Sequence, residues 1–149
     1  MECATFFEGV AHPVPSGSHP ADLTPAEIEG WSARTNVRLL EEHCGPSKGE
    51  VIGFWPHAGT LRMAGVVTDS DLSERLLNGS VRGLSLGTNV MVRRDGSVGA
   101  RVLEECSLCR EPARAGCYVD HIANERVLAV HNASTEAGVL GGPCRAPAR

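Results

Sequence analysis

The 149-residue sequence contains no long hydrophobic run, and this absence argues against two classes of protein. No apolar stretch approaches the ~20 residues that a membrane-spanning helix needs, so no membrane partner is expected. The first eight residues have no basic segment followed by an apolar one, so no secretory signal is predicted. The six cysteines are therefore expected to be reduced thiols in an intracellular setting rather than a disulfide framework.

An excess of positive charge is also missing, because 14 Lys and Arg face 18 Asp and Glu and give a net charge of -4. This balance gives no electrostatic case for a nucleic-acid-binding protein, so no such partner is expected. Hydrophobic residues make up 42% of the chain and charged residues 21%, which argues against global disorder. The length suits one domain with a core of its own, and the sequence shows no internal repeat.

Many short, β-rich segments are present instead. An Asp95-Gly96 pair lies between two of them and indicates a hairpin. A turn is predicted at Gly45–Gly49, where glycine and proline gather. The segment 121–130 does not decide between helix and strand. Strands are predicted at residues 4–10, 36–42, 50–55, 60–67, 80–92, 98–109 and 117–119.

Two helices are predicted between these strands. Thr24-Pro25-Ala26-Glu27 combines an N-cap threonine, a proline at the first helical position and a glutamate that completes a capping box, so a helix should run to about Ala33. A second helix should begin near Asp71 and end before Gly79. Strands with a few inserted helices indicate an α+β or barrel fold rather than a βαβ one.

The most informative segment is Val81–Thr88, in which Ser85 lies between two glycines. A histidine, His43, precedes it, and a glutamate pair, Glu104-Glu105, follows it. Serine, histidine and glutamate are the three chemical types of a charge-relay nucleophile: a hydroxyl that attacks, a base, and an anion that holds the base. The alternative is an ordinary buried serine in a tight strand.

Gly83-Leu84-Ser85-Leu86-Gly87 also satisfies the G-x-S-x-G pattern of the α/β-hydrolase nucleophile elbow. An elbow requires a helix after the serine, whereas residues 88–92 are β-like. It would also leave His121 or His131 as the base, because the acid and the histidine follow the serine in that fold. A serine esterase of this kind is kept as an alternative function.

In these residues the sequence resembles the capsid maturation proteases of herpesviruses (assemblin) and the prohead proteases of tailed phages. The resemblance covers roughly residues 36–119. Gly83–Leu86 is similar to the nucleophile segment of the family, and Leu39–His43 followed by Val51-Ile52-Gly53 is similar to its histidine segment. The stretch Leu103–Ala113 resembles the phage segment that carries the third catalytic residue as a glutamate.

The resemblance implies that Ser85 is the nucleophile, His43 the general base and Glu105 the acid that orients the histidine. His57 is the rival base, but it comes too late relative to Val51-Ile52-Gly53. Glu104 is the rival acid, and neighbouring residues on a strand face opposite ways, so only one glutamate serves.

The resemblance further implies an oxyanion site at Arg114 and the backbone amide of Ala113. The family usually has two arginines here, and this sequence has alanine at the first position. The alternative is a solvated surface arginine.

The implied function is that of a serine endopeptidase without a cofactor, which cleaves a capsid scaffold protein and itself. The implied fold is a mostly antiparallel, closed β-barrel of about seven strands surrounded by a few helices. Herpesvirus relatives are active as dimers, so a homodimer is expected. The implied location is the interior of a capsid or prohead, in the host nucleus for a eukaryotic virus and in the host cytoplasm for a phage.

The C-terminal stretch carries a candidate self-cleavage site. We interpret residues 1–131 as the protease domain and residues 132–149, rich in Gly, Pro, Ala and Arg, as a flexible tail. Val130–Ser134 resembles the sites that these proteases cut, with the scissile bond between Ala133 and Ser134. A coincidental Ala-Ser pair in a stretch of small residues is the alternative.

Two readings without catalysis stay open. Cys106, Cys109, Cys117 and His121 have the spacing C-x2-C-x7-C-x3-H, which is compatible with a structural zinc site in a binding module. Residues three apart on a regular strand point to opposite faces, which argues against this site and favours buried free thiols. An inactive relative that keeps the fold is the other reading.

Overall fold

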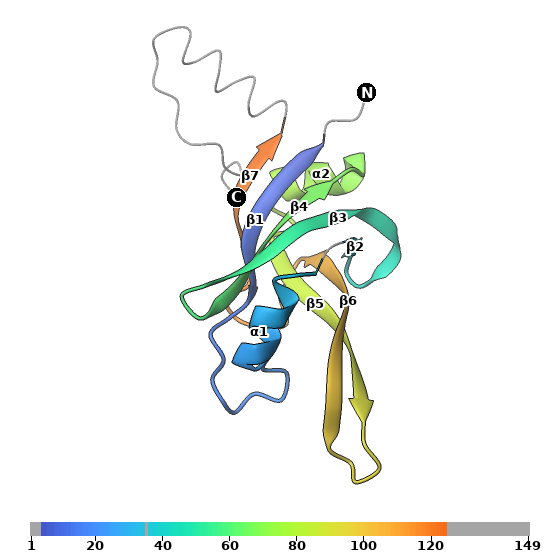
Figure 1. Cartoon of the computed structure of the whole chain (residues 1–149). Coiled ribbons are helices and arrows are strands. Elements are labelled where there is room, and N and C mark those ends of the chain that lie inside the picture. Colours follow the sequence, from blue (N-terminus) through green and yellow to red (C-terminus); the bar gives the residue numbers. More distant parts are fainter. Residues whose placement is uncertain (1–3, 35, 125–149) are drawn as a thin grey trace, which may run out of the picture.

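The computed structural model describes residues 4–34 and 36–124. The described chain is α+β, as predicted, and its seven strands are mostly antiparallel. The elements are β1 (Thr5–His12), α1 (Pro25–Trp31), β2 (Val37–Glu41), β3 (Cys44–His57), β4 (Thr60–Val67), α2 (Ser70–Leu77), β5 (Gly83–Val92), β6 (Val98–Cys109) and β7 (Val119–Asn124) (Figure 1).

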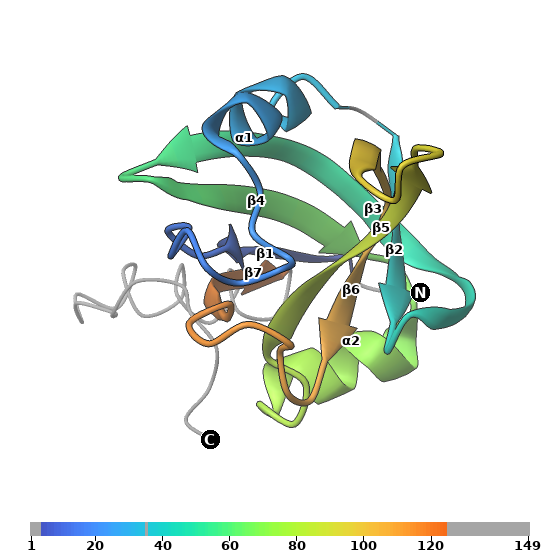
Figure 2. The same ribbon diagram turned by 90° about the horizontal axis from the view of Figure 1, so that it is seen from below.

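The prediction of a closed barrel is wrong. The strands form one open sheet in the order β5-β6-β2-β3-β4-β1-β7, in which only β2 and β6 run parallel. The two edge strands approach each other, but an isolated bridge between Gly83 and Tyr118 is the pairing found there within the described residues. Beyond that bridge β5 leaves the body of the protein together with β6, so the edges cannot stay paired (Figures 1 and 2).

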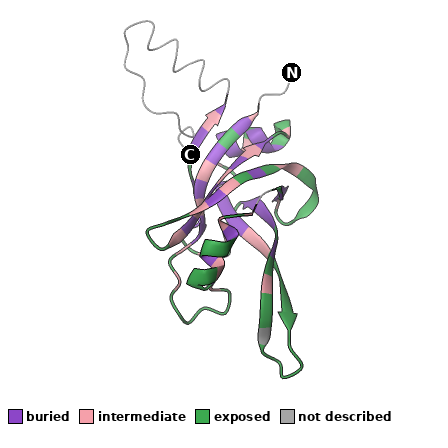
Figure 3. Ribbon diagram, viewed as in Figure 1, coloured by how far each residue is buried: buried purple, intermediate pink, exposed green. Residues whose placement is uncertain are grey.

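The core follows the alternation of the strands and is covered by the two helices. On β4, alternate residues Leu61, Met63 and Val67 are fully buried. Leu72 and Leu76 of α2 are also fully buried, one helical turn apart. Figure 3 shows this burial concentrated in the body of the sheet, while the far end of the β5–β6 hairpin is exposed.

Both predicted helices are confirmed, with small shifts at their ends. The capping box of α1 is formed, because the Thr24 side chain accepts from the Glu27 amide and the Glu27 side chain accepts from the Thr24 amide. The helix ends at Trp31, two residues before the predicted end. The second helix begins at Ser70, and Gly79 follows it with a positive φ of 85°. None of the helices in the described residues is long and apolar enough to span a membrane.

The reversal between β2 and β3 differs from its prediction. Gly45–Gly49 belongs to β3, and the chain reverses instead at Glu42 and His43. Both residues have left-handed backbones, with φ of 52° and 61°, which is the conformation of a tight two-residue hairpin. This conformation is unfavourable for residues other than glycine, and such residues cluster at functional sites. The chain therefore places His43 at a strained turn.

The remaining predictions concern the hairpin after Ser85 and the last strand. Residues 93–97 connect β5 to β6, as the Asp95-Gly96 signal indicated. The ambiguous segment 121–130 is strand up to Asn124, and the rest of it lies outside the described residues.

Candidate active site

Three side chains that are distant in the sequence meet beside β5. The Nε2 atom of His43 lies 2.9 Å from the Ser85 hydroxyl, and its Nδ1 atom bonds the Glu105 carboxylate at Oε1. The imidazole thus bridges a hydroxyl and a carboxylate through its two nitrogens. This arrangement lets the histidine accept a proton from the serine while the carboxylate fixes the ring orientation and stabilises the imidazolium.

The sheet register brings the three residues together. On the antiparallel pair β5–β6, Ser85 lies opposite Ser107 and Gly87 lies opposite Glu105. On the parallel pair β2–β6, Glu41 lies opposite Leu108, so the turn that follows β2 carries His43 to the same place. The His43 ring, from the turn after β2, therefore contacts both the Glu105 carboxylate on β6 and the Ser85 hydroxyl on β5.

The three groups differ in burial, because the serine and the glutamate are buried and the histidine is partly exposed. Glu105 and Ser85 are 6% and 9% exposed, whereas the His43 side chain is 42% exposed. A buried carboxylate interacts strongly with its partner because little water screens it. The histidine ring is partly exposed to solvent, whereas the carboxylate that it contacts is enclosed by protein.

The two rivals lie elsewhere. His57 is the last residue of β3, exposed and paired with Thr60 in the β3–β4 turn. Glu104 is exposed and accepts a hydrogen bond from Asn89 at 3.2 Å. Of the two glutamates, Glu105 is thus the one that contacts His43.

Gly83 and Gly87, on either side of Ser85, each lie too close to other atoms of the protein to carry a side chain. A Cβ atom on Gly83 would lie 2.8 Å from the backbone nitrogen of Pro112, and one on Gly87 would lie 2.0 Å from Oε1 of Glu105. Glycine lets the backbone approach where a side chain cannot fit. The serine itself lies within β5, a strand that continues to Val92, so the α/β-hydrolase elbow, which needs a helix after the serine, does not describe this site.

Ser85 opens into a cleft of about 370 Å³. Its wall is formed by four regions: the end of β1 with the loop that follows, alternate residues of β5 as far as Val90, Arg101 of β6, and the segment after β6. They include Ala11, Leu84, Leu86, Ala113 and Arg114. The cleft therefore brings the serine, both predicted oxyanion residues and small apolar side chains to one surface.

Arg114 is held in the wall by two residues that sequence reasoning missed. Its Nη2 atom lies 2.5 Å from Oδ1 of Asp22, and its Nη1 atom lies 3.2 Å from Nε2 of His12. Burial opposes the ionisation of Asp22, but hydrogen bonds led by that from Arg114 lower its pKa well below its usual range. No local sequence pattern signals this pair, because the two residues are 92 positions apart.

A third missed residue is Ser107. It is fully buried, lies opposite Ser85 on β6 and bonds both Glu105 and the backbone of His43. Residues two apart on a strand share a face, so the spacing from Glu105 was an available signal.

The cysteines do not gather into the zinc site that the alternative reading requires. Cys106, Cys109 and Cys117 are buried free thiols, and burial raises the pKa of Cys109 to about 12 and that of Cys117 to about 11. The thiol of Cys106 instead contacts the Met63 sulfur at 3.1 Å. Among the described residues, these cysteines and His121 form no group of ligand atoms close enough to share a metal.

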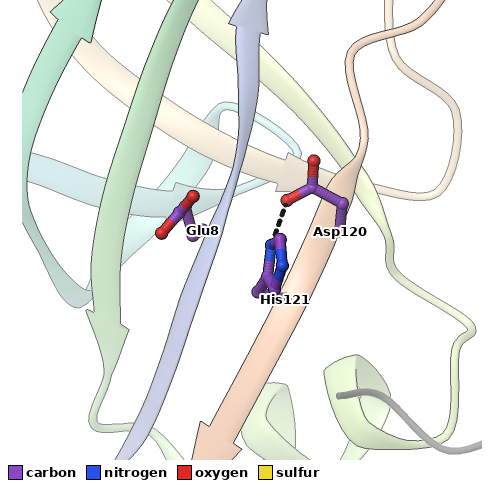
Figure 4. Close-up of side chains that lie close together, drawn as sticks. All are labelled: Glu8, Asp120 and His121. Carbon is purple, nitrogen blue, oxygen red and sulfur yellow. Dashed lines mark hydrogen bonds and ion pairs between the residues drawn. The ribbon is translucent and has the colours of Figure 1, made fainter. Parts of the chain in front are cut away.

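A different group has metal-compatible spacing. Glu8, Asp120 and His121 bring their ligand atoms within 4.8 Å of one another (Figure 4). Arg62 donates to both carboxylates at 2.8 Å, so a guanidinium already supplies their positive partner. The group is therefore a surface ion-pair network in this structure.

Residues 125–149 lie outside the described part of the chain, and with them the candidate cleavage site Ala133-Ser134, the alternative base His131 and the tail 132–149.

Herpesvirus proteases are among the solved structures with the same fold. A KSHV protease in complex with a hexapeptide phosphonate inhibitor matches with a TM-score of 0.63 and 18% identity, over 89% of this chain and 70% of that chain. Varicella-zoster virus protease matches with a TM-score of 0.58 and 14% identity, over 80% and 64% of the two chains. A Kaposi's sarcoma-associated herpesvirus protease in complex with a dimer disruptor matches with a TM-score of 0.56 and 17% identity, over 87% and 81%.

No family model matches the chain, and no curated protein matches it in sequence. At these identities the structural matches show the fold, and they agree with the herpesvirus branch of the predicted resemblance. The phage branch stays a prediction.

Proposed function

We propose that this protein is a serine endopeptidase of the capsid-maturation type, with Ser85 as nucleophile, His43 as general base and Glu105 as the residue that orients His43. The observation that carries the proposal is the single imidazole that contacts the Ser85 hydroxyl through Nε2 and the Glu105 carboxylate through Nδ1. The herpesvirus protease fold supports it independently, because the geometry and the fold similarity are separate observations.

The proposed chemistry has two stages. Ser85 Oγ attacks the carbonyl carbon of the scissile bond while His43 Nε2 takes its proton, and the carbonyl π electrons move to the oxygen. The tetrahedral intermediate collapses, the C–N bond breaks, and His43 gives the proton to the leaving amine. Water then attacks the acyl carbon while His43 takes its proton, the ester C–O bond to Ser85 breaks, and His43 returns the proton to Ser85 Oγ as the carboxylic acid product leaves.

The developing oxyanion needs donors that are fixed before the reaction. Arg114 and the Ala113 amide are the proposed donors, since both residues line the cleft that contains Ser85. The two contacts that Arg114 makes with Asp22 and His12 would hold its guanidinium in the cleft wall.

The proposed substrate is an extended peptide cut after alanine. Strand β5 is an edge of the sheet, and beyond Leu84, whose amide bonds the Cys117 carbonyl, we propose that its outer backbone groups pair with an added strand. The cleft beside Ser85 is lined by small and aliphatic side chains such as Ala11, Leu84 and Leu86, which suit a small side chain in the substrate. We propose a capsid scaffold protein and the Ala133-Ser134 bond of this chain as substrates.

Dimerisation and location are further parts of the proposal. A homodimer is proposed because compounds described as dimer disruptors bind proteases with this fold. The proposed location is the interior of a viral capsid or prohead.

The test is the intact mass of the concentrated, incubated protein beside that of its Ser85→Ala variant. We expect the wild type to lose the segment after Ala133 and the variant to stay whole. A synthetic peptide spanning residues 127–138 serves as a second substrate, so that a tail that cannot reach the cleft does not hide activity.

Glu105→Gln should lower kcat roughly 10²- to 10⁴-fold, by analogy with the loss of a triad acid. The matched control Glu104→Gln should not, and cleavage by Ser85→Ala would refute the assignment.

A further inference from the structure

Ser107 uses both functions of its hydroxyl on the two partners of the candidate nucleophile. Its Oγ accepts a hydrogen bond from the backbone N–H of His43 at 3.0 Å and donates one to Oε2 of Glu105 at 2.7 Å. The residue is fully buried, so water does not compete for these bonds. A single side chain therefore connects the backbone of the base to the carboxylate of the acid.

The two bonds act on the parts of the site that most need support. His43 has a left-handed backbone with φ of 61°, and its N–H bond to Ser107 ties this unfavourable conformation to β6. Glu105 has two carboxylate oxygens, and the hydroxyl satisfies Oε2 while Oε1 bonds the His43 ring. The carboxylate is thereby prevented from rotating away from Nδ1.

Gly87 lies on the other side of the carboxylate and leaves space for it. It lies opposite Glu105 in the β5–β6 register, and a Cβ atom at this position would lie 2.0 Å from Oε1 and 2.7 Å from the carboxyl carbon. Real atoms do not approach so closely, so any side chain here would displace the carboxylate or the strand. The carboxylate rests where the side chain of residue 87 would otherwise be.

We propose that Ser107 and Gly87 form a cradle that positions Glu105 against His43, Ser107 by hydrogen bonding and Gly87 by leaving room. Both are positioning residues, since they act on Ser85 only through the histidine and the glutamate. The inference rests on the proposed function for its kinetic consequence, whereas the geometry of the cradle can be tested without any enzymatic activity.

The first measurement is spectroscopic. The proton on His43 Nδ1, bonded to a buried carboxylate, should give a downfield proton NMR resonance that is absent from His43→Ala. We expect this resonance in the wild type and its loss or displacement in Ser107→Ala and Gly87→Ala. Ser107→Thr, which keeps the hydroxyl, should retain it.

The second measurement is the rate at which diisopropyl fluorophosphate labels Ser85, followed by mass spectrometry. Ser107→Ala should slow labelling about 10- to 100-fold, the range expected when a hydrogen bond to a charged group is lost. Ser107→Thr should recover most of the rate. For the peptide spanning residues 127–138, kcat should fall while KM changes little, because the cradle does not contact the substrate.

Two control variants separate positioning from general damage. Ser73→Ala removes another buried serine, whose hydroxyl has no hydrogen-bond partner among the described residues. Gly53→Ala adds a methyl group to a strand at a position with no atom within 4 Å of the new Cβ. Both should keep the resonance and the labelling rate. Circular dichroism establishes that each variant is folded, and Ser107→Ala tests the cradle alone if Gly87→Ala does not fold.

The outcomes distinguish this inference from the proposed function. An unchanged resonance in folded Ser107→Ala overturns the cradle whatever the kinetics show. A resonance that responds as expected in a protein whose Ser85 is never labelled upholds the cradle and refutes the hydrolase. Equal loss of rate in Ser73→Ala and Ser107→Ala also overturns the cradle, because it would reflect core damage.

Discussion

The carboxylate of Asp22 lies 2.5 Å from the guanidinium of Arg114 and joins the loop after β1 to the segment after β6. The second oxygen of Asp22 accepts from the Gly17 amide at 2.9 Å and from the Ser16 hydroxyl at 3.1 Å. One aspartate thus fixes a proline-rich loop and also orients the arginine of the cleft wall. A change at Asp22 should therefore affect the cleft and the loop together.

Asp22→Asn should lower kcat more than it raises KM. The neutral amide keeps the size of the carboxylate but loses the charge-assisted bond to Arg114, which belongs to the stronger class of hydrogen bonds. We expect a fall of about 10-fold or more in kcat for the peptide spanning residues 127–138. The double variant with Arg114→Ala is the control, because Asp22→Asn should have a clearly smaller effect once the arginine is absent, with only its contribution through the loop remaining. Additive losses would show that Asp22 does not act through Arg114.

His12 should make stability depend on pH in the acidic range. Burial, aided by the charge of Arg114, lowers the pKa of His12 below its ordinary value of 6.5, although hydrogen bonding to the Pro13 carbonyl and the charge of Asp22 oppose the shift. The unfolded chain then binds more protons at this residue than the folded one, so the stabilisation is complete above pH 6.5 and is lost as the pH falls through the lower, folded pKa.

The structural reason for this dependence is that His12 Nε2 accepts a hydrogen bond from the Leu23 amide at 3.1 Å, which a protonated ring cannot do. Urea unfolding at pH 5 and pH 8 measures the effect, and His12→Gln should reduce the difference between the two. Hydrogen exchange should show the Leu23 amide losing protection at pH 5. An identical pH dependence in His12→Gln would assign the effect to other groups.

Gly83→Ala should destabilise the protein and reduce activity. A Cβ atom here would lie 2.8 Å from the Pro112 nitrogen and 3.1 Å from the Cys109 carbonyl oxygen, both backbone atoms that yield little. Overpacking of this kind typically costs about 1–3 kcal/mol, and here it would displace the segment that leads to Arg114. Urea unfolding measures the loss. Gly53→Ala, in open space, should be neutral or stabilising by about 0.4–1 kcal/mol.

Local signals predicted the parts of the fold that local physics decides. The capping box of Thr24 and the hairpin at Asp95-Gly96 were read correctly, because neighbouring residues alone determine them. The turn at Glu42-His43 was missed, since its left-handed backbone depends on bonds to residues about 65 positions away, such as that from the Glu42 amide to the Leu108 carbonyl. The open sheet was missed for a similar reason, because edge pairing depends on the path of β5 beyond Ser85.

Some residues of the candidate site could likewise be predicted from the sequence, and others could not. Ser85, His43 and Glu105 were selected by type, order and a family resemblance, and the structure brings all three together. Asp22 carries no pattern of its own and was overlooked. Gly87 was noted only as part of a motif, whereas the structure gives it a different reason, the space that Glu105 occupies.

The cysteines offer a last prediction, which separates buried free thiols from a metal site. Cys44 is exposed, whereas Cys106, Cys109 and Cys117 are buried. Only the thiolate reacts readily, and burial raises the pKa of Cys109 to about 12 and that of Cys117 to about 11.

Iodoacetamide at pH 7.5 should therefore label Cys44 first among these four in the native protein, and the other three only after unfolding. Peptide mass spectrometry identifies the sites, and Cys44→Ser is the matched control that removes the fast reaction. Brief treatment with EDTA should change neither the labelling pattern nor the unfolding midpoint. The Cys106 thiol contacts the Met63 sulfur, and among the described residues the buried thiols do not share a metal site. Release of about one zinc per chain, with new labelling at Cys106 and Cys109, would instead establish a zinc-stabilised module.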